Sequence, residues 1–434
     1  MTGRISFARA AAVALVGLLT LAATLPLILT PGTAHGANFT VNNSADLGDA
    51  NPGDGVCEVI RTPGICTLRA AIQEANALDG DDTIALPAST FTLTIAGAGE
   101  NAAATGDLDI TDIGNKLTII GAGAAFTHIN GGGIDRVFQV LSLTTLELSG
   151  VTITNGNAGA DDGGGIFNGG SLTLTDSQVT NSTADNGGGI YNRAGTGLPF
   201  FTPAGSLTLN GSDVSGNSAN GNGGGVWNGG TLTGTDATAT ANTAAAVGGG
   251  IFNSGTLTLT NSTVSDNTIT TVGFGRGGGI FNASGGTAAI TSSTINGNSA
   301  GDEGGGIWNG GTLTLTATFV VFNATQRGGG LYNASGASLS VSGGSFQGNN
   351  GGFSGGGIAN VGGTVTMTDS QVIGNTAGNG GGIYHVDGSA TLTDTTISNN
   401  TADGTTSPSG QGGGIYIARE SIMVTDPSPT LVLT

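Results

Sequence analysis

Few side chains in this 434-residue sequence have the types and spacing needed for chemistry. The regular part of the chain contains two adjacent acidic pairs, Asp161-Asp162 and Asp302-Glu303, each directly before a run of glycines. A glycosidase needs two carboxyl groups at a fixed separation, and a polysaccharide lyase needs calcium-binding acids beside a basic residue. Both pairs lie where turns are expected, so we interpret them as solvated turn acids.

Basic and nucleophilic partners for these acids are also scarce. His128 and His385 have no Ser, Asp or Cys in the arrangement that hydrolases use. No motif indicates a cofactor. The repeats contain no lysine, and their arginines are scattered: Arg193, Arg276, Arg327 and Arg419. The sequence therefore favours a non-catalytic protein, with a carbohydrate-active enzyme, either a polysaccharide lyase or a glycosidase, as the alternative.

A column of aromatic residues is the candidate binding site. A phrase of three glycines, an aliphatic residue, usually an aromatic and usually an asparagine returns ten times, first at residues 163–168. Mutual stacking explains the aromatics without a ligand, whereas an outward stripe that binds glycans or surface proteins of a host or neighbouring cell is the alternative. The column comprises Phe167, Tyr191, Trp227, Phe252, Phe281, Trp308, Tyr332, Tyr384 and Tyr416, with Ala359 at the one gap.

The period of the phrase predicts the elements that carry these residues. Steps of 24 to 36 residues between successive phrases indicate a repeat architecture. Within residues 163–186, three short alternating segments place Ile166, Leu172, Leu174 and Val179 inside and threonines outside. The glycines suit sharp corners and the asparagines suit a hydrogen-bonded ladder. We predict an all-β, right-handed parallel β-helix.

The N-terminal part has a different character. Arg4 and Arg9 before an apolar run predict a signal peptide over residues 1–36. Cys57 and Cys66 predict a disulfide, and residues 67–78 predict an amphipathic helix with Thr67 as its N-cap. We expect residues 37–135 to form a cap and first coils, because a solenoid end needs a cover, and residues 136–434 to form the repeats.

Asp49, Asn51 and Asp54 resemble a calcium loop because they place oxygen ligands around a glycine. Their spacing does not match an EF-hand, and no bidentate glutamate follows. We therefore interpret the stretch as a solvated turn and predict no metal site.

Charge excludes several partner classes. The formal charge is −19, and it becomes −21 once residues 1–36 and their two arginines are removed. Lys116 is the only lysine. Nucleic acid and anionic membrane surfaces are poor partners for such a chain. We predict no membrane span after the signal peptide, and the sequence leaves the oligomeric state open.

A family resemblance is carried by four N-terminal segments. Residues 66–71 (CTLRAA), preceded by residues 54–57 (DGVC) and followed by residues 106–110 (GDLDI) and 135–138 (DRVF), resemble the CSLREA domain of secreted bacterial proteins. Thr67 and Ala70 depart from the name-giving motif. The downstream repeats are similar to those of polymorphic outer membrane proteins and of pectin-lyase-like β-helices. The resemblance implies a location outside the cell and no agreed enzymatic activity.

Together these observations predict a secreted or cell-surface protein with a non-catalytic adhesion, binding or structural role. Residues 429–434 read as the strand of one more coil. We expect that edge to be protected by assembly, or the chain to be a fragment of a longer protein that carries an anchor.

Overall fold

The computed structural model describes residues 36–60, 62–197, 202–271, 273–404, 410–418 and 430–433. The predicted signal peptide lies outside the described residues, apart from Gly36. From Gly36 onward the chain forms one compact unit.

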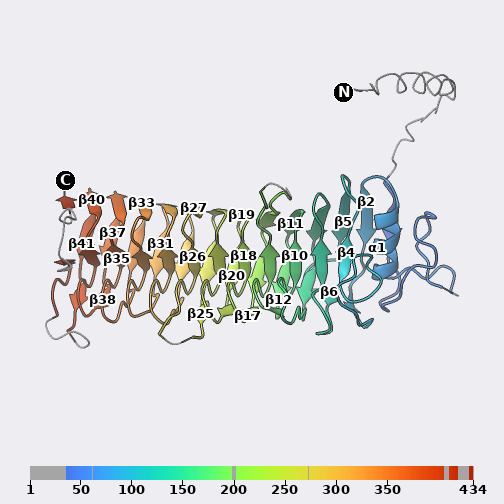
Figure 1. The fold of residues 1–434 in the computed structure, drawn as a ribbon, viewed down its shortest axis with the longest axis horizontal. Helices are drawn as coiled ribbons and strands as arrows, with labels where there is room; N and C mark the ends of the chain where they lie inside the picture. Colours follow the sequence, from blue (N-terminus) through green and yellow to red (C-terminus); the bar gives the residue numbers. More distant parts are fainter. Residues whose placement is uncertain are drawn as a thin grey trace, which may run out of the picture. The chain divides into compact units, whose positions relative to one another are not determined.

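Three parallel sheets run along this unit, and each turn of the chain, here called a coil, adds one strand to each sheet (Figure 1). Sheet 1 takes the strand that ends the glycine phrase, sheet 2 the next strand and sheet 3 the third. Connections between parallel strands of one sheet are right-handed in nearly all proteins. The fold is the predicted right-handed parallel β-helix.

Sheet 1 contains β4 (Leu108–Ile110), β7 (Phe138–Val140), β10 (Ile166–Asn168), β14 (Ile190–Asn192), β18 (Val226–Asn228), β22 (Ile251–Asn253), β26 (Ile280–Asn282), β29 (Ile307–Asn309), β32 (Leu331–Asn333), β35 (Ile358–Val361), β39 (Ile383–Val386) and β43 (Ile415–Ala418). Sheet 2 contains β1 (Asn38–Thr40), β2 (Asp82–Ala85), β5 (Lys116–Ile120), β8 (Thr145–Ser149), β11 (Ser171–Thr175), β15 (Ser206–Asn210), β19 (Thr231–Thr235), β23 (Thr256–Thr260), β27 (Thr287–Thr291), β30 (Thr312–Thr316), β33 (Ser338–Ser342), β36 (Thr364–Thr368), β40 (Ser389–Thr393) and β44 (Thr430–Leu433).

Sheet 3 contains β3 (Ser89–Thr92), β6 (Thr127–Asn130), β9 (Thr152–Thr154), β12 (Gln178–Thr180), β16 (Asp213–Ser215), β20 (Thr238–Thr240), β24 (Thr263–Ser265), β28 (Thr294–Asn296), β31 (Phe319–Val321), β34 (Ser345–Gln347), β37 (Gln371–Ile373) and β41 (Thr396–Ser398). Two-residue strands follow in some coils: β13 (Thr183–Ala184), β17 (Ser218–Ala219), β21 (Thr243–Ala244), β25 (Thr268–Ile269), β38 (Thr376–Ala377) and β42 (Thr401–Ala402).

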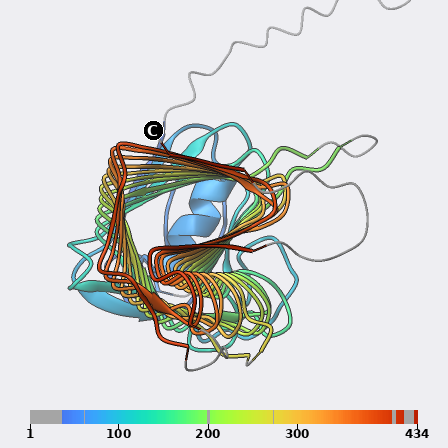
Figure 2. The same ribbon diagram turned by 90° about the vertical axis from the view of Figure 1, so that its left-hand side faces the viewer.

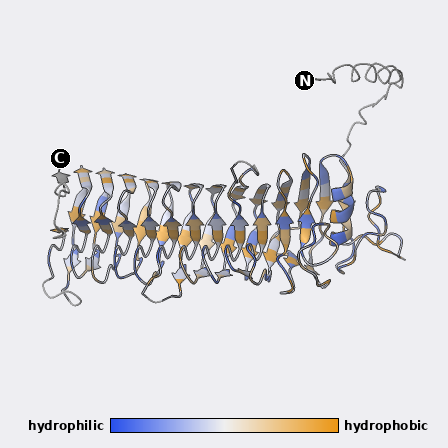
Figure 3. Cartoon of the chain, viewed as in Figure 1, coloured by the Kyte–Doolittle hydropathy of each residue, from blue (hydrophilic) through white to orange (hydrophobic). Residues whose placement is uncertain are grey.

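The coil at residues 163–186 has the predicted alternation. Ile166, Leu172, Leu174 and Val179 are fully buried and belong to one core that continues through the coils. Each pairs with its equivalent in the next coil, as Leu172 does with Leu207. The hydrophobic residues therefore recur in the strands of successive coils (Figure 3).

The glycine run makes a corner that other residues fit poorly. Gly163 has a φ of +73°, which favours glycine. A Cβ on Gly164 would lie 2.3 Å from the carbonyl oxygen of Thr183, and one on Gly165 would lie 2.7 Å from that of Gly189 in the next coil. The corner needs both the left-handed conformation and the close approach of backbones, as predicted.

The asparagine of the phrase forms a buried ladder. Asn168 donates from Nδ2 to Oδ1 of Asn192 at 2.7 Å, and the pattern repeats up to Asn360, which contacts Nδ1 of His385 at 2.9 Å. A second ladder runs from Asn217 to Asn400 along the corner after sheet 3. The predicted amide-to-amide stacking is confirmed.

Helix α1 (Leu68–Ala77) covers the N-terminal end. Thr67 is its N-cap and accepts a hydrogen bond from the Ala70 amide at 3.2 Å. Leu68 and Ile72 join the same core as the coils, and α1 lies within the outline of the coils when viewed along the stack (Figure 2). The predicted disulfide, Cys57–Cys66, is present beside the helix.

The sequence missed some strands. It did not predict β6 or the two-residue strands. β6 has only one buried apolar residue, Ile129, because its other buried position is the polar Thr127. Such a short alternation gives little signal. The strand predicted near residue 430 is confirmed, since β44 pairs with β40. Among the described residues, no helix is long and apolar enough to span a bilayer.

Candidate binding surface

The nine aromatic residues occupy one outward position of sheet 1. The register pairs Phe167 with Tyr191 and continues coil by coil to Tyr416, with Ala359 at one position. On the N-terminal side, Gln139 and then Asp109 hold the same position. The sequence therefore predicted the alignment of this aromatic column correctly.

The rings stack on one another. Six rings from Phe167 to Trp308 form a continuous stack, with neighbouring centroids 4.2–5.5 Å apart and interplanar angles of 5–12°. Tyr384 and Tyr416 form a second pair at 5.4 Å. Because the rings are nearly parallel at about one strand spacing, each inner ring has both faces covered by its neighbours. The exposed part of an inner ring is therefore its edge.

Local glycines make room for the two indoles. A Cβ on Gly229 would lie 2.5 Å from the Trp227 ring, and a Cβ on Gly310 would lie 2.5 Å from the Trp308 ring. Each tryptophan ring thus packs against the glycine two residues later in the chain, which has no side chain to obstruct it. This contact fixes the rings in the plane that stacking requires.

Tyr332 differs from the other eight. Tyr332 is buried, with 7% of its surface exposed, whereas each of the other eight aromatic residues is partly exposed. Burial raises its pKa to about 12, and the neighbouring Glu303 charge adds to the shift. The expectation that all nine rings line an outer face is wrong at this position, because Tyr332 is packed among the charged residues beside it.

Those charged residues form a cluster across three coils. Arg276 Nε lies 2.9 Å from Glu303 Oε2, and Arg327 Nη2 lies 3.0 Å from Glu303 Oε1. Arg327 also contacts both Asp302 oxygens, at 2.8 and 3.0 Å. Trp308 donates from Nε1 to Glu303 Oε2 at 3.1 Å, and the Arg276 guanidinium lies 5.6 Å from the centre of its ring.

The interpretation of Asp302 and Glu303 as solvated turn acids is therefore wrong. The Glu303 side chain is 6% exposed and that of Asp302 is 14% exposed, while the two arginine side chains are 41–44% exposed. Glu303 accepts from two guanidiniums and an indole, which leaves it no open oxygen for a substrate. The geometry is that of a closed ion cluster and not of an acid–base pair.

A sequence signal for this cluster existed. Arg276, Glu303 and Arg327 each stand directly before a glycine run, and they form a one-residue ladder of parallel bridges. Aligning the chain on its glycine phrases would place the three in one column. The arginines were described as scattered because their wide separation along the sequence hides their common position in the coil.

Asp161 and Asp162 behave differently from each other. The Asp161 side chain is 76% exposed, which agrees with a turn acid. Asp162 accepts a hydrogen bond from Asn186 Nδ2 at 2.9 Å, and burial raises its pKa. This pair holds no catalytic arrangement.

Arginine side chains accompany the aromatic column along its length. Arg136 lies 5.6 Å from the centre of the Phe167 ring at the N-terminal end of the stack. The charge of Arg193 acts on Tyr191, and that of Arg327 acts on Tyr332. Of the five arginines in the described part of the chain, only Arg69 is elsewhere. Among the described residues, the guanidinium groups of this acidic chain thus gather along the column.

Buried acids lie at the N-terminal end of the column. Asp107 is 2% exposed and 3.5 Å from Arg136, and burial raises its pKa to about 7, with Asp109 adding to the shift. Asp109 is fully buried, and burial raises its pKa to about 6. Asp109 Oδ1 has no hydrogen-bond partner among the described residues. No periodic pattern in the sequence indicates this group of buried acids.

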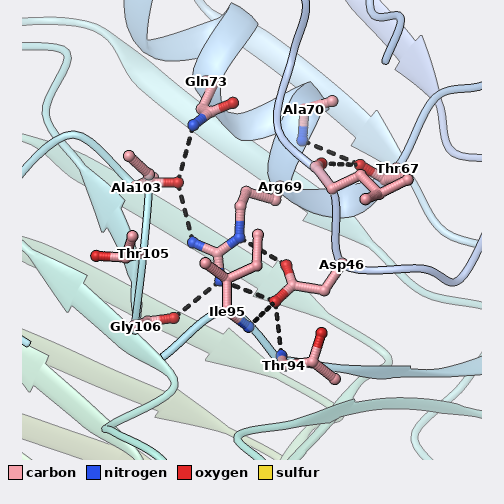
Figure 4. Close-up of polar contacts among 12 residues, drawn as sticks. Asp46, Thr67, Arg69, Ala70, Gln73, Thr94, Ile95, Ala103, Thr105 and Gly106 are labelled. Atoms are coloured by element: carbon pink, nitrogen blue, oxygen red, sulfur yellow. Dashed lines mark hydrogen bonds and ion pairs between the residues drawn. The ribbon is translucent and has the colours of Figure 1, made fainter. Parts of the chain in front are cut away.

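Two of the segments that carry the family resemblance, residues 66–71 and 106–110, meet at this junction (Figure 4). The Arg69 guanidinium pairs with Asp46 at 2.6 Å and donates to the carbonyl oxygens of Gly106 at 2.8 Å and Asp107 at 3.2 Å. Asp46 in turn accepts the amides of Thr94 and Ile95. The buried Arg69 is thereby fully hydrogen-bonded and ties the helix to the first coils.

The stretch that resembles a calcium loop is held by ordinary turn contacts. Asp49 accepts the amides of Asn51 at 2.8 Å and Glu58 at 3.1 Å, and Asp54 accepts that of Val56 at 2.9 Å. Over the described residues, no group of three or more His, Cys, Asp or Glu is arranged to hold a metal ion. The carboxylates act as turn acceptors.

Comparisons with protein-family models, curated proteins and solved structures give no match. The resemblance to the CSLREA domain therefore stays a prediction.

Proposed function

We propose that this protein is a secreted or cell-surface β-helix with a non-catalytic adhesion, binding or structural role. The supporting observation is that the repeated residues contact one another. The asparagines hydrogen-bond to their equivalents in neighbouring coils, the aromatic rings stack, and the acids of the cluster are paired with its arginines. No carboxylate of the cluster is left open to a substrate.

The aromatic column supports contact with a partner through ring edges and guanidiniums. Arg276, which lies over the Trp308 ring, and Arg327, which shares Glu303 with it, are both partly exposed and offer donors to hydroxyl or carboxylate oxygens of a glycan or a surface protein. A sugar cannot lie flat on an inner ring such as Trp227, because Tyr191 lies 4.2 Å and Phe252 5.5 Å away on its two faces. The Trp308 end of the stack is the place where binding is best supported.

Export and family membership are part of the same proposal. A disulfide suits an oxidising compartment, which supports a location outside the cytoplasm. Contacts of Arg69 and Arg136 with Gly106 and Asp107 give the resembling segments a shared structural task as a cap. That supports a CSLREA-like capping region ahead of the repeats.

The test compares binding and turnover in the same samples. We expect the purified chain to bind immobilised glycans or cell-surface proteins without releasing any product, and Trp308→Ala to weaken binding more than Trp227→Ala. Melting curves of both variants would show that each is folded. Absence of binding to glycans and to cell surfaces would remove the adhesion role.

The carbohydrate-active enzyme is favoured by one observation, the convergence of Asp302, Glu303, Arg276 and Arg327 on one surface. It predicts that some polysaccharide is cleaved and that Glu303→Gln abolishes cleavage. We expect no product from uronate-containing or neutral polysaccharides, because both acids are already paired. Turnover that disappears in Glu303→Gln would establish the enzyme instead.

A further inference from the structure

Sheet 2 carries an unusually uniform outer face. From β11 to β40, nine strands each present three outward side chains, and all but two of these are threonine or serine. The exceptions are Asn210 and Ala289. We call this surface the threonine face. It contains no charged residue, although the mature chain is strongly acidic, and the charged pair Lys116–Glu147 lies just before it.

At the C-terminal end of this face, Ser389 Oγ donates to Thr364 Oγ1 at 3.4 Å and Thr368 Oγ1 donates to the carbonyl oxygen of Val341 at 3.4 Å, whereas the strands before them differ. From β11 to β33, no side chain of the threonine face hydrogen-bonds to another described residue, and its positions are exposed or half-exposed. The outward hydroxyls of sheet 3 are used differently: Thr238 donates to Asp213 at 2.5 Å, and Thr240 contacts Ser265 at 2.5 Å. From β11 to β33 the threonine face therefore keeps its hydrogen-bonding capacity for something outside the chain.

Strand propensity alone does not explain the uniformity. Sheet 3 has the same outward, parallel positions in the same coils, yet it places Gln178, Asp213, Phe319 and Ile373 there. Threonine suits strands in both sheets. The restriction to small hydroxyl residues in sheet 2 therefore indicates that this surface has a function that excludes larger or charged side chains.

The face is a regular lattice. Neighbouring strands lie about 4.8 Å apart, and outward residues along a strand repeat about every 6.7 Å. Nine strands then give a surface of roughly 38 by 13 Å. Because χ1 of threonine is restricted, the methyl and hydroxyl groups keep a common orientation along each column. No large side chain rises above them, so the surface is flat.

A lattice of this kind fits few ligands. It has no aromatic ring, no charge and one amide, so it lacks the groups that usually orient a sugar or an ionic ligand. Its repeats are of the same order as the oxygen spacings in hexagonal ice. Fixed methyl groups order the neighbouring water, and free hydroxyls can hydrogen-bond to it. We propose that the threonine face binds ice.

The proposal is independent of the aromatic column and is tested on ice directly. The purified chain is expected to be taken up by a slowly growing ice hemisphere and to inhibit ice recrystallisation. Thr233→Tyr/Thr258→Tyr, which raises two rings at the centre of the face, is expected to lose both activities. The matched control Thr263→Tyr/Thr294→Tyr places the same rings on neighbouring strands of sheet 3 and is expected to retain them.

Circular dichroism and the melting midpoint of both double variants would show that loss of activity is not loss of fold. Ala289→Thr fills the gap in the central column and is expected to inhibit recrystallisation at a lower concentration. The proposal is overturned if the wild-type chain stays in the liquid, or if the sheet 2 and sheet 3 variants behave alike. An Ala289→Thr variant no stronger than wild type would contradict the lattice match.

Discussion

Buried asparagines show how a single side chain stabilises a coil. Asn253 is fully buried, accepts from Asn228 at 2.7 Å and donates to Asn282 at 2.8 Å. Each amide thus satisfies its neighbours above and below. A buried polar group costs free energy unless it is hydrogen-bonded, so the column is stable only as a whole.

Asn253→Ala should therefore be destabilising. It leaves Oδ1 of Asn282 without its donor and removes one acceptor of Asn228, which we expect to cost about 1–3 kcal/mol. Urea or thermal unfolding would measure this, with the exposed Asn220→Ala as the matched control. Equal midpoints for the two variants would show that the ladder contributes nothing.

The buried acid Asp109 gives stability a pH dependence. Its pKa is raised to about 6, so between about pH 4 and pH 6 the folded chain holds a proton that the unfolded chain has released. Stability from this group is present at low pH and is lost as the pH rises through about 6. Asp107, with a pKa near 7, acts in the same direction.

Asp109→Asn removes the buried charge and keeps an acceptor for the Ala103 amide, which Oδ2 accepts at 3.0 Å. We expect the melting temperature of the variant to fall less than that of wild type between pH 4 and pH 7. Parallel curves for the two proteins would contradict the assignment.

For the elements, the features that could be predicted from the sequence are those encoded by the apolar–polar alternation within strands and by the repeat period. Ile166, Leu172 and Val179 were placed inside correctly because each short strand has an apolar–polar pattern. The Glu303 cluster could not be found from that pattern, because it depends on which residues of separate coils share a corner position. The burial of Tyr332 followed from the same contacts and was missed for the same reason.

Glu303 joins three coils at this corner, because its carboxylate pairs with arginines of the two neighbouring coils. Glu303→Gln removes the charge that pairs with Arg276 and Arg327, and we expect a loss of about 1–2 kcal/mol because water compensates the partly exposed guanidiniums. In a Trp227→Phe background Trp308 is the only tryptophan, so its emission would report the lost indole contact. Asp161→Asn, which changes an exposed acid, should leave stability and emission unchanged; an equal effect of both would argue against the cluster.

For the whole molecule, the three sheets, the two ladders and the aromatic stack all depend on one coil-to-coil register. A shift of one residue in any strand would turn its threonines inward and its leucines outward. The proposed binding surfaces follow from the same register, since the aromatic column and the threonine face are both rows of equivalent positions.

Disulfide formation between introduced cysteines tests this register most directly. Thr233 and Thr258 are paired on neighbouring strands, so their Cα atoms lie about one strand spacing apart, within the range for a disulfide. We predict that Thr233→Cys/Thr258→Cys forms an intramolecular bond on mild oxidation and that Thr233→Cys/Thr291→Cys, two strands apart, does not. Failure of the first pair to cross-link, or equal cross-linking of both pairs, would contradict the β-helix register.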